Sequence, residues 1–142
     1  MGPQIDIRPF APADEAAVIA LWRKCDLLRP QNDPKKDIAR KLKVNPEWFL
    51  VAVAAGRIVG VVMAGYEGHR GWINYLGVEP GLRRGGLGCR LMTEAEERLR
   101  AAGCPKINLM VRADNAAVIA FYERLGFSRD NVVSLGKRLV VD

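Results

Sequence analysis

The chain has 142 residues, of which 49% are apolar and 27% charged, and it carries a formal net charge of +6. That length is typical of one domain with its own core, so we expect a single domain over residues 1–142. No apolar run approaches the roughly 18 residues of a membrane-spanning helix. The N-terminus lacks the basic and then apolar pattern of a secretory signal. We therefore expect a cytoplasmic protein with no membrane partner.

The excess of basic residues is spread along the sequence and does not gather on one predicted helix. Aromatic residues are not interleaved with basic ones as in single-strand binders, so no nucleic-acid partner is expected. A small polyanionic ligand suits this charge better. The three cysteines have no paired spacing, which disfavours a disulfide framework. His69 is the only histidine, which excludes a multi-histidine metal site, and we expect no metal.

The first part of the chain predicts a strand and two helices. The strand covers about residues 5–9, and Asp14 is a candidate N-cap for the first helix. Asp33 and Pro34 supply the cap and the first turn of the second helix. The apolar face of the first helix carries Val18, Leu21, Trp22 and Cys25.

The middle of the chain predicts a hairpin of two apolar strands with a tight turn at residues 55–56, and a further strand that stops at Pro80. A glycine-rich stretch then opens a long helix. A strand over 106–111, a short helix and a closing strand over 131–141 follow, and a brief strand over 127–129 would add one more. We therefore expect an α/β fold in which a mixed central sheet of six to seven strands is flanked by about four helices.

Residues 77–92, GVEPGLRRGGLGCRLM, combine glycines and arginines where a strand gives way to a helix. Bare glycines, the N–H groups of a first helical turn and nearby arginines favour an anion, typically a phosphate. Two nucleotide-binding motifs do not fit. A P-loop needs Lys and then Ser or Thr after Gly88, where Cys89 and Arg90 stand, and a Rossmann fingerprint needs glycine in place of Leu91. A glycine-rich turn with solvated arginines is the alternative.

Two segments resemble signatures of the GNAT superfamily of N-acetyltransferases. Arg83-x-x-Gly86-x-Gly88 is similar to its acyl-CoA motif, and residues 114–127, DNAAVIAFYERLGF, are similar to its second signature, an asparagine followed by a helix ending in Phe-Tyr-x-x-x-Gly-Phe. The order of the expected elements matches as well, so the resemblance covers nearly the whole chain. It implies a GNAT-like fold, acetyl-CoA as cosubstrate, and direct acetyl transfer to a primary amine of a small molecule, peptide or protein.

The resemblance also implies residues that bind acetyl-CoA. The backbone of Leu76, Gly77 and Val78 would pair with the pantetheine arm, and an N–H near Val78 would polarise the thioester carbonyl. Asn115 would hydrogen-bond the pantetheine chain, while capping of the following helix is an equally good role for it. The loop that holds the diphosphate would comprise Arg83, Arg84, Gly85, Gly86, Leu87, Gly88 and Cys89.

Tyr122 is the implied catalytic acid, because a phenol can protonate the departing thiolate of CoA. Its spacing alone would equally fit a core residue. An amine with a pKa near 10.4 must lose a proton before it attacks, so a general base is needed. Neither central strand carries an acid before Glu79. Glu67 is therefore preferred as the base, with His69 and a water relay as alternatives, although both side chains also suit an ordinary loop.

The acceptor is expected at the loop between the first two helices, which forms one wall of the cleft in this family. Arg29 and Asn32 are the candidate substrate residues, with Arg29 suited to an acceptor carboxylate. The main alternative function is a catalytically weak acyl-CoA-binding regulatory module, which the missing strand carboxylate favours. A homodimer in which terminal strands pair is compatible with the sequence, which does not require it.

Overall fold

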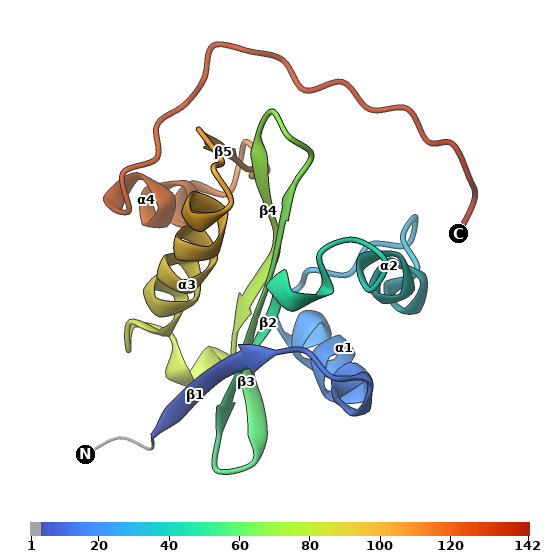
Figure 1. The fold of residues 1–142 in the computed structure, drawn as a ribbon, viewed down its shortest axis with the longest axis vertical. Coiled ribbons are helices and arrows are strands. Elements are labelled where there is room, and N and C mark those ends of the chain that lie inside the picture. The colour runs from blue at the N-terminus through green and yellow to red at the C-terminus, as the bar shows by residue number, and fades with distance from the viewer. Residues whose placement is uncertain (1–3) are drawn as a thin grey trace. The chain divides into compact units, whose positions relative to one another are not determined.

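The computed structural model describes residues 4–142, and these fall into two compact units that divide after Leu109 (Figure 1). The first unit holds a β-sheet and three α-helices. The second unit, residues 110–142, holds one α-helix followed by an extended C-terminal segment. Each unit is described in turn.

The first unit is built on a five-stranded sheet in the order β1-β2-β3-β4-β5. Its strands are β1 (Ile5–Pro9), β2 (Phe49–Ala54), β3 (Arg57–Tyr66), β4 (Gly71–Val78) and β5 (Ile107–Asn108). Neighbours from β1 to β4 are antiparallel, and β5 runs parallel to β4. The predicted hairpin is confirmed, because Ala55 (φ 49°) and Gly56 (φ 75°) adopt the two positive φ angles of a tight hairpin turn.

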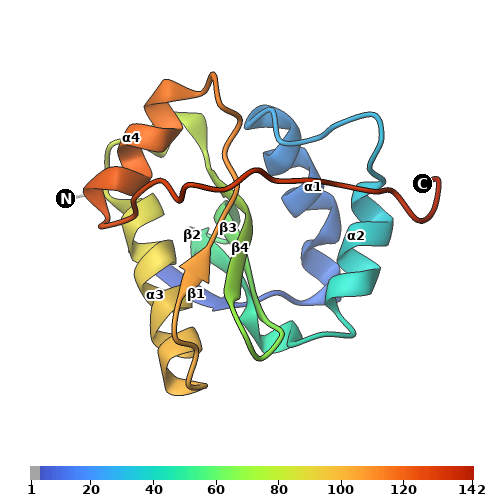
Figure 2. The ribbon, with the colours of Figure 1, turned by 90° about the horizontal axis from the view of Figure 1, so that it is seen from above.

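Helices cover both faces of this sheet (Figure 2). α1 (Glu15–Lys24) and α2 (Pro34–Lys41) lie on one face and α3 (Leu87–Ala101) on the other. Asp33 caps α2 as predicted, since its carboxylate accepts two N–H groups of the first turn. None of the helices in residues 4–142 is both long and apolar enough to cross a membrane. Short 3-10 turns lie at Pro12–Asp14, Pro46–Trp48 and Pro80–Leu82.

Asp14 precedes α1 as predicted, but its side chain does not cap that helix. Its carboxylate instead accepts hydrogen bonds from the Arg8 guanidinium at 2.7 Å and from the Ala11 N–H at 2.8 Å. The ion pair with Arg8 across the turn stabilises this carboxylate more than a hydrogen bond to the N-terminus of α1 would. Asp14 therefore ties β1 to the turn that leads into α1.

The core of the first unit differs between the two faces of the sheet. On the α1 side, the buried Trp22 ring stacks on Phe49 and on Tyr75, with 6.4 Å and 4.0 Å between centroids. On the α3 side, the helix approaches the sheet closely at Gly60, where a Cβ would lie 2.9 Å from the Leu91 side chain. This close approach sets where the N-terminus of α3 lies relative to the strands.

The second unit contains α4 (Ala116–Arg124). Asn115 caps this helix, because its side-chain oxygen accepts the Val118 N–H at 3.3 Å. Tyr122 is buried and makes an edge-on contact with Phe127, with 5.6 Å between the ring centroids. The short helix between residues 115 and 126 is thus present as predicted.

The sheet has five strands, so the expectation of six to seven is wrong. The strand expected over 106–111 covers only Ile107–Asn108, and neither 127–129 nor 131–141 forms a strand in the second unit. The valines and leucines there have the β propensity that suggested strands, but a strand also needs a hydrogen-bonded neighbour. Residues 131–141 have no strand neighbour in the described chain, and their apolar side chains are exposed, Leu135 at 91%.

Candidate functional site

Strand β4 carries a β-bulge at residues 75–76. In its pairing with β3, two residues of β4, Tyr75 and Leu76, lie opposite the single residue Val62. Tyr75 has a φ of 55°, in the left-handed region that non-glycine residues rarely occupy. Bulges bend a strand and are frequent beside active sites, where they redirect backbone groups. The bulge immediately precedes two of the three residues expected to hold pantetheine.

One edge of β4 is open beyond its first two residues. β5 pairs with β4 only at Gly71 and Trp72. Within the described part of the first unit, the edge from Ile73 to Val78 has no strand partner on that side. Peptide groups along an unpaired edge can hydrogen-bond an extended ligand as another strand would. This is where the resemblance places the pantetheine arm.

The glycine-rich loop joins β4 to α3 with two residues in the left-handed region, Arg84 (φ 75°) and Gly86 (φ 82°). No side chain caps α3, and its first backbone bond runs from the Arg90 N–H to the Gly86 carbonyl at 3.0 Å. The N–H groups of residues 87–89 precede that bond, as at any helix N-terminus. Together with the helix dipole they can hold an anion.

The arginines of this loop differ in their contacts. Arg83 turns back to β4, where its Nε donates to the Val78 carbonyl at 3.3 Å. Arg84 is exposed beside the glycines. Of the predicted loop residues, only Leu87 is buried, so its side chain belongs to the core. Its N–H group is one of those in the first turn of α3. The loop thus presents a backbone with positive charge around it.

Two residues that the sequence did not point to meet at the bulge. The Tyr75 hydroxyl donates to Asp37 Oδ2 at 2.7 Å, and the Tyr75 ring stacks on Trp22. Asp37 lies on α2, one turn before Lys41, whose Nζ donates to the Ala64 carbonyl. Burial lowers the pKa of Lys41. Contacts from α1 and α2 therefore converge on one residue of β4.

Strand alternation in the sequence could not predict this contact. A Cβ at Gly71 would lie 3.2 Å from Leu99, so residue 71 faces α3. Strict alternation would point residue 75 toward α3 as well. The bulge turns Tyr75 to the opposite face instead, and nothing in the local sequence marks a bulge there.

Cys25 also lies closer to the site than its sequence position suggests. Its Sγ donates to the Val78 carbonyl at 3.3 Å and would lie 3.3 Å from a Cβ at Gly77. α1 ends at Lys24, so Cys25 follows the helix, where the sequence suggested that it would lie on its apolar face. The thiol packs against Gly77 of β4, where an added Cβ would make a tight contact.

Glu67 and His69 lie in the exposed turn between β3 and β4. The Glu67 carboxylate accepts the N–H groups of His69, at 2.9 Å, and Arg70, and it accepts from Trp72 Nε1 at 3.0 Å. These hydrogen bonds, the one from Arg70 foremost, lower the pKa of Glu67 and so make it a weaker base. The structure thus brings Glu67 and His69 together in the turn.

Arg29 and Asn32 meet in the loop between α1 and α2. The Arg29 guanidinium donates to the carbonyls of Asp26 at 2.9 Å and Leu28 at 3.0 Å. The Asn32 N–H donates to the Arg29 carbonyl at 3.0 Å. In this structure the guanidinium is turned back on its own loop, where it holds the chain after α1.

The two site residues of the second unit are Asn115, which caps α4, and Tyr122. Burial raises the pKa of Tyr122 to about 12. The phenol therefore keeps its proton throughout the neutral range and is available as a donor. Asn115 has the capping role that the sequence offered as one of its two alternatives.

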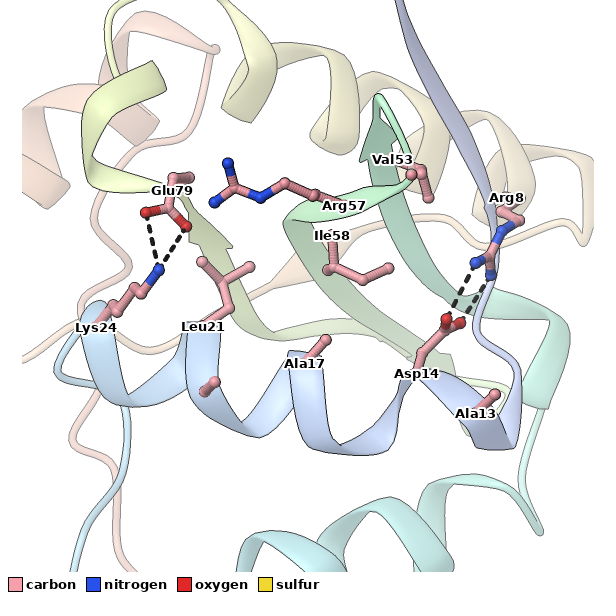
Figure 3. Close-up of a pocket in the computed structure, with 12 residues that line it drawn as sticks. Arg8, Ala13, Asp14, Ala17, Leu21, Lys24, Val53, Arg57, Ile58 and Glu79 are labelled. Atoms are coloured by element: carbon pink, nitrogen blue, oxygen red, sulfur yellow. Dashed lines mark hydrogen bonds and ion pairs between the residues drawn. The ribbon is translucent and has the colours of Figure 1, made fainter.

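A pocket of about 400 Å³ lies between α1 and the β2–β3 hairpin (Figure 3). Two ion pairs line it, Arg8 with Asp14 at 2.7 Å and Lys24 with Glu79 at 3.2 Å. Arg57 extends along it toward Glu79. None of the residues expected to bind acetyl-CoA lines this pocket, and Glu79 links it to the end of β4.

Comparisons with known proteins identify the family. A sequence model described as the acetyltransferase (GNAT) family matches residues 15–127. The chain belongs to the GNAT family of acetyltransferases. Acetyltransferase YE1169 of Yersinia enterocolitica is 54% identical over 138 residues, which cover 97% of this chain and 98% of that protein. This GNAT protein is therefore an enzyme of the acyltransferase class.

Solved structures show the same fold. Ard1 from Thermoplasma volcanium matches with a TM-score of 0.74 and 26% identity, over 87% of this GNAT chain and 82% of that one. The aminoglycoside N-acetyltransferase AAC(6')-Iy, solved in complex with CoA, matches with a TM-score of 0.78 and 16% identity, over 99% and 98% of the two chains. Among residues 4–142, no three His, Cys, Asp or Glu side chains group as metal ligands.

Proposed function

We propose that this GNAT enzyme transfers acetyl from acetyl-CoA directly to a primary amine. One observation carries the proposal: β4 is bulged and open along one edge, and it runs straight into an uncapped, glycine-rich helix start. A strand edge for an amide-bearing chain and an anion site for a diphosphate then follow each other along the backbone. Acetyl-CoA has these two parts in the same order, and the related fold of AAC(6')-Iy holds CoA.

Within this proposal, the loop holds the diphosphate through Arg83, Arg84 and the N–H groups up to Cys89. The backbone of residues 76–78 pairs with the pantetheine arm, and an N–H near Val78 polarises the thioester carbonyl. Asn115 hydrogen-bonds the pantetheine chain in addition to capping α4. The acceptor enters from the α1–α2 side, where Arg29 and Asn32 lie on the connecting loop.

The reaction follows as one addition and one elimination. The neutral amine attacks the thioester carbon, a C–N bond forms, and the carbonyl oxygen becomes an oxyanion held by backbone N–H groups. The C–S bond then breaks and sulfur leaves with the electron pair. One amine proton passes to a base. Of the sequence candidates, Glu67 and His69 precede β4 and residues 76–78 end it, roughly 20 Å away along an extended strand, so a water relay is the route that we retain. Because its pKa is also lowered, the Glu67 carboxylate would act only at the distant end of such a relay.

We assign Tyr122 to the departing sulfur. Its phenol, with a pKa of about 12, is a weaker acid than an ordinary thiol, whose pKa is near 8.5. Proton transfer from this phenol to a free thiolate would therefore be unfavourable. We infer that the phenol donates a hydrogen bond to the sulfur and stabilises the negative charge that develops on it during C–S cleavage, so that CoA leaves as a thiolate bonded to Tyr122.

Replacement of Tyr122 by Phe tests the enzyme against its rival, the catalytically weak CoA-binding module. We expect thiol release to fall by roughly 10²-fold or more, because a positioned proton donor contributes about 10²–10⁴-fold. Calorimetry should show unchanged acetyl-CoA binding. Tyr66→Phe is the matched control, since that exposed hydroxyl only donates to loop carbonyls at Gly68 and Gly103. Equal turnover in Tyr122→Phe would refute the acid, and binding without turnover across an amine panel would favour the module.

A further inference from the structure

Tyr75 has a backbone conformation that its side chain does not favour. Its φ of 55° lies in the left-handed region, where a Cβ crowds the backbone and bulky residues are outliers. Such strain persists only when the surrounding structure holds it in place, and it gathers at functional sites. The residue is also the first of the two that form the bulge of β4.

Two contacts hold Tyr75 in this conformation. Its ring stacks on Trp22 of α1, with centroids 4.0 Å apart and planes at 18°, and Trp22 is fully buried. Its hydroxyl donates to Asp37 Oδ2 of α2 at 2.7 Å. The Asp37 side chain is 24% exposed, so this bond is partly shielded from water. We call these three residues the bulge clamp.

The bond to Tyr75 is the stronger of the two contacts made by the Asp37 carboxylate. Its other oxygen lies 3.4 Å from the half-exposed Arg40 guanidinium, and such surface pairs contribute little. The remaining cations of α2 are Lys35, Lys36 and Lys41, and Lys41 donates to the Ala64 carbonyl. Asp37 therefore acts on the strand mainly through the Tyr75 hydroxyl.

We propose that Asp37 and Tyr75 are positioning residues that hold the bulge so that the N–H near Val78 faces the acetyl carbonyl. This inference rests on the proposed function. The bulge sets which way the following peptide groups point, because one extra residue shifts the alternation of the strand. If the clamp loosens, the strand can slip toward regular alternation and turn those groups away. Oxyanion stabilisation depends on this geometry.

The variants separate the clamp from general packing. Tyr75→Phe keeps the ring stack and removes the hydroxyl, whereas Asp37→Ala removes the acceptor. Because both break the same bond, the double variant should be no worse than either single one. Asp37→Asn keeps an acceptor oxygen and should remain close to wild type. Asp33→Ala is the structural control, because it removes the cap of α2 and leaves all three side chains of the clamp unchanged.

The experiment follows the carbonyl carbon of [1-¹³C]acetyl-CoA bound to the full chain by NMR, together with turnover of the best amine in a panel. We expect the bound resonance of the wild type to be displaced from that of free acetyl-CoA. In Tyr75→Phe and Asp37→Ala this resonance should move back toward the free value. The kcat of both variants should fall roughly 10- to 100-fold, which does not exceed the fall in kcat when an oxyanion donor is removed. The dissociation constant of CoA should change less than about threefold, since the diphosphate contacts are kept.

Asp33→Ala should lower the melting temperature and leave the carbonyl resonance in place. The inference is overturned if Tyr75→Phe keeps the wild-type resonance and kcat, or if Asp33→Ala shifts the resonance as far as the clamp variants do. It is also overturned if the wild type binds acetyl-CoA without displacing the resonance, an outcome that leaves the proposed function standing. Absence of acetyl-CoA binding would instead refute the proposed function itself.

Discussion

At the scale of single residues, some carboxylates in the first unit hold backbone groups in place. Asp33 accepts N–H groups of α2, Glu67 accepts the N–H groups of His69 and Arg70, and Asp14 accepts that of Ala11. From residue type alone, each of these acids is a candidate general base. For Glu67 these bonds, and for Asp14 the bond from Arg8 foremost, lower the carboxyl pKa and reduce its basicity.

Asp14 offers a prediction about stability and pH. The Arg8 guanidinium, and to a smaller extent the Ala11 N–H, hold the pKa of Asp14 below its usual 3.8. The ionised carboxylate therefore stabilises the fold above the unfolded pKa of about 3.9, and this contribution is lost as the pH falls through the lower folded pKa. At pH 7, Asp14→Asn should cost about 1–3 kcal/mol in urea unfolding, and the difference from wild type should shrink in acid.

Asp26→Asn provides the comparison for Asp14. Its side chain is 93% exposed and its contact with Arg29 spans 3.4 Å, so the change should stay within about 0.5 kcal/mol. If Asp14→Asn proves equally mild at pH 7, the pair with Arg8 does not stabilise the fold. A difference that grows in acid would contradict the sign argued above.

At the scale of elements, local signals predicted where helices and strands begin better than they predicted pairing. The cap at Asp33, the turn at residues 55–56 and the stop of β4 before Pro80 follow from backbone chemistry within a few residues. The strands expected over 127–129 and 131–141 depended on a distant partner, which propensity alone does not supply. The bulge at Tyr75 likewise depends on how β3 and β4 align.

The docking of α3 on the sheet offers a prediction that links packing to binding. A Cβ at Gly60 would meet Leu91 at 2.9 Å, Ala52 at 3.2 Å and Leu87 at 3.3 Å. Gly60→Ala should therefore cost about 1–3 kcal/mol through overpacking. It should also weaken acetyl-CoA binding, because Leu87 opens the helix whose first N–H groups would hold the diphosphate.

Gly65→Ala on the same strand is the matched control for Gly60. There the nearest atom to an added Cβ is Lys41 Nζ at 3.8 Å, an ordinary contact. Thermal unfolding and calorimetry of both variants should separate them. Wild-type acetyl-CoA affinity in a destabilised Gly60→Ala would show that the position of α3 does not govern binding.

At the scale of the whole molecule, the net charge of +6 is consistent with a polyanionic cosubstrate. The expectations of a single domain and of a homodimer stay predictions. Within residues 131–141, exposed side chains such as Leu135 and Val141 lie on an extended chain with no strand neighbour among the described residues. Their β propensity suits a strand only where a partner supplies the hydrogen bonds.

The charge predicts how salt affects ligand binding. Added salt shortens the screening length from about 30 Å at 0.01 M to about 8 Å at 0.15 M. The dissociation constant of CoA should therefore rise between low and physiological salt. That of pantetheine, which lacks phosphates, should change little. Calorimetric titration of both ligands checks this, and equal salt responses would argue against an electrostatic diphosphate site in the loop after β4.

The sequence by itself determined the family, the glycine-rich loop that opens α3, the capping of α2 and α4, and the β2–β3 hairpin. Each of these rests on residues that act within a few positions of one another or on motifs that survive as short patterns. Only the tertiary structure decided that Tyr75 turns toward α1 and α2, that Asp37 meets its hydroxyl, and that Cys25 meets the Val78 carbonyl. These contacts join residues 38 and 53 positions apart, and a single bulge in strand pairing selects them. Because the register of two strands is a property of their pairing, no local pattern contains it.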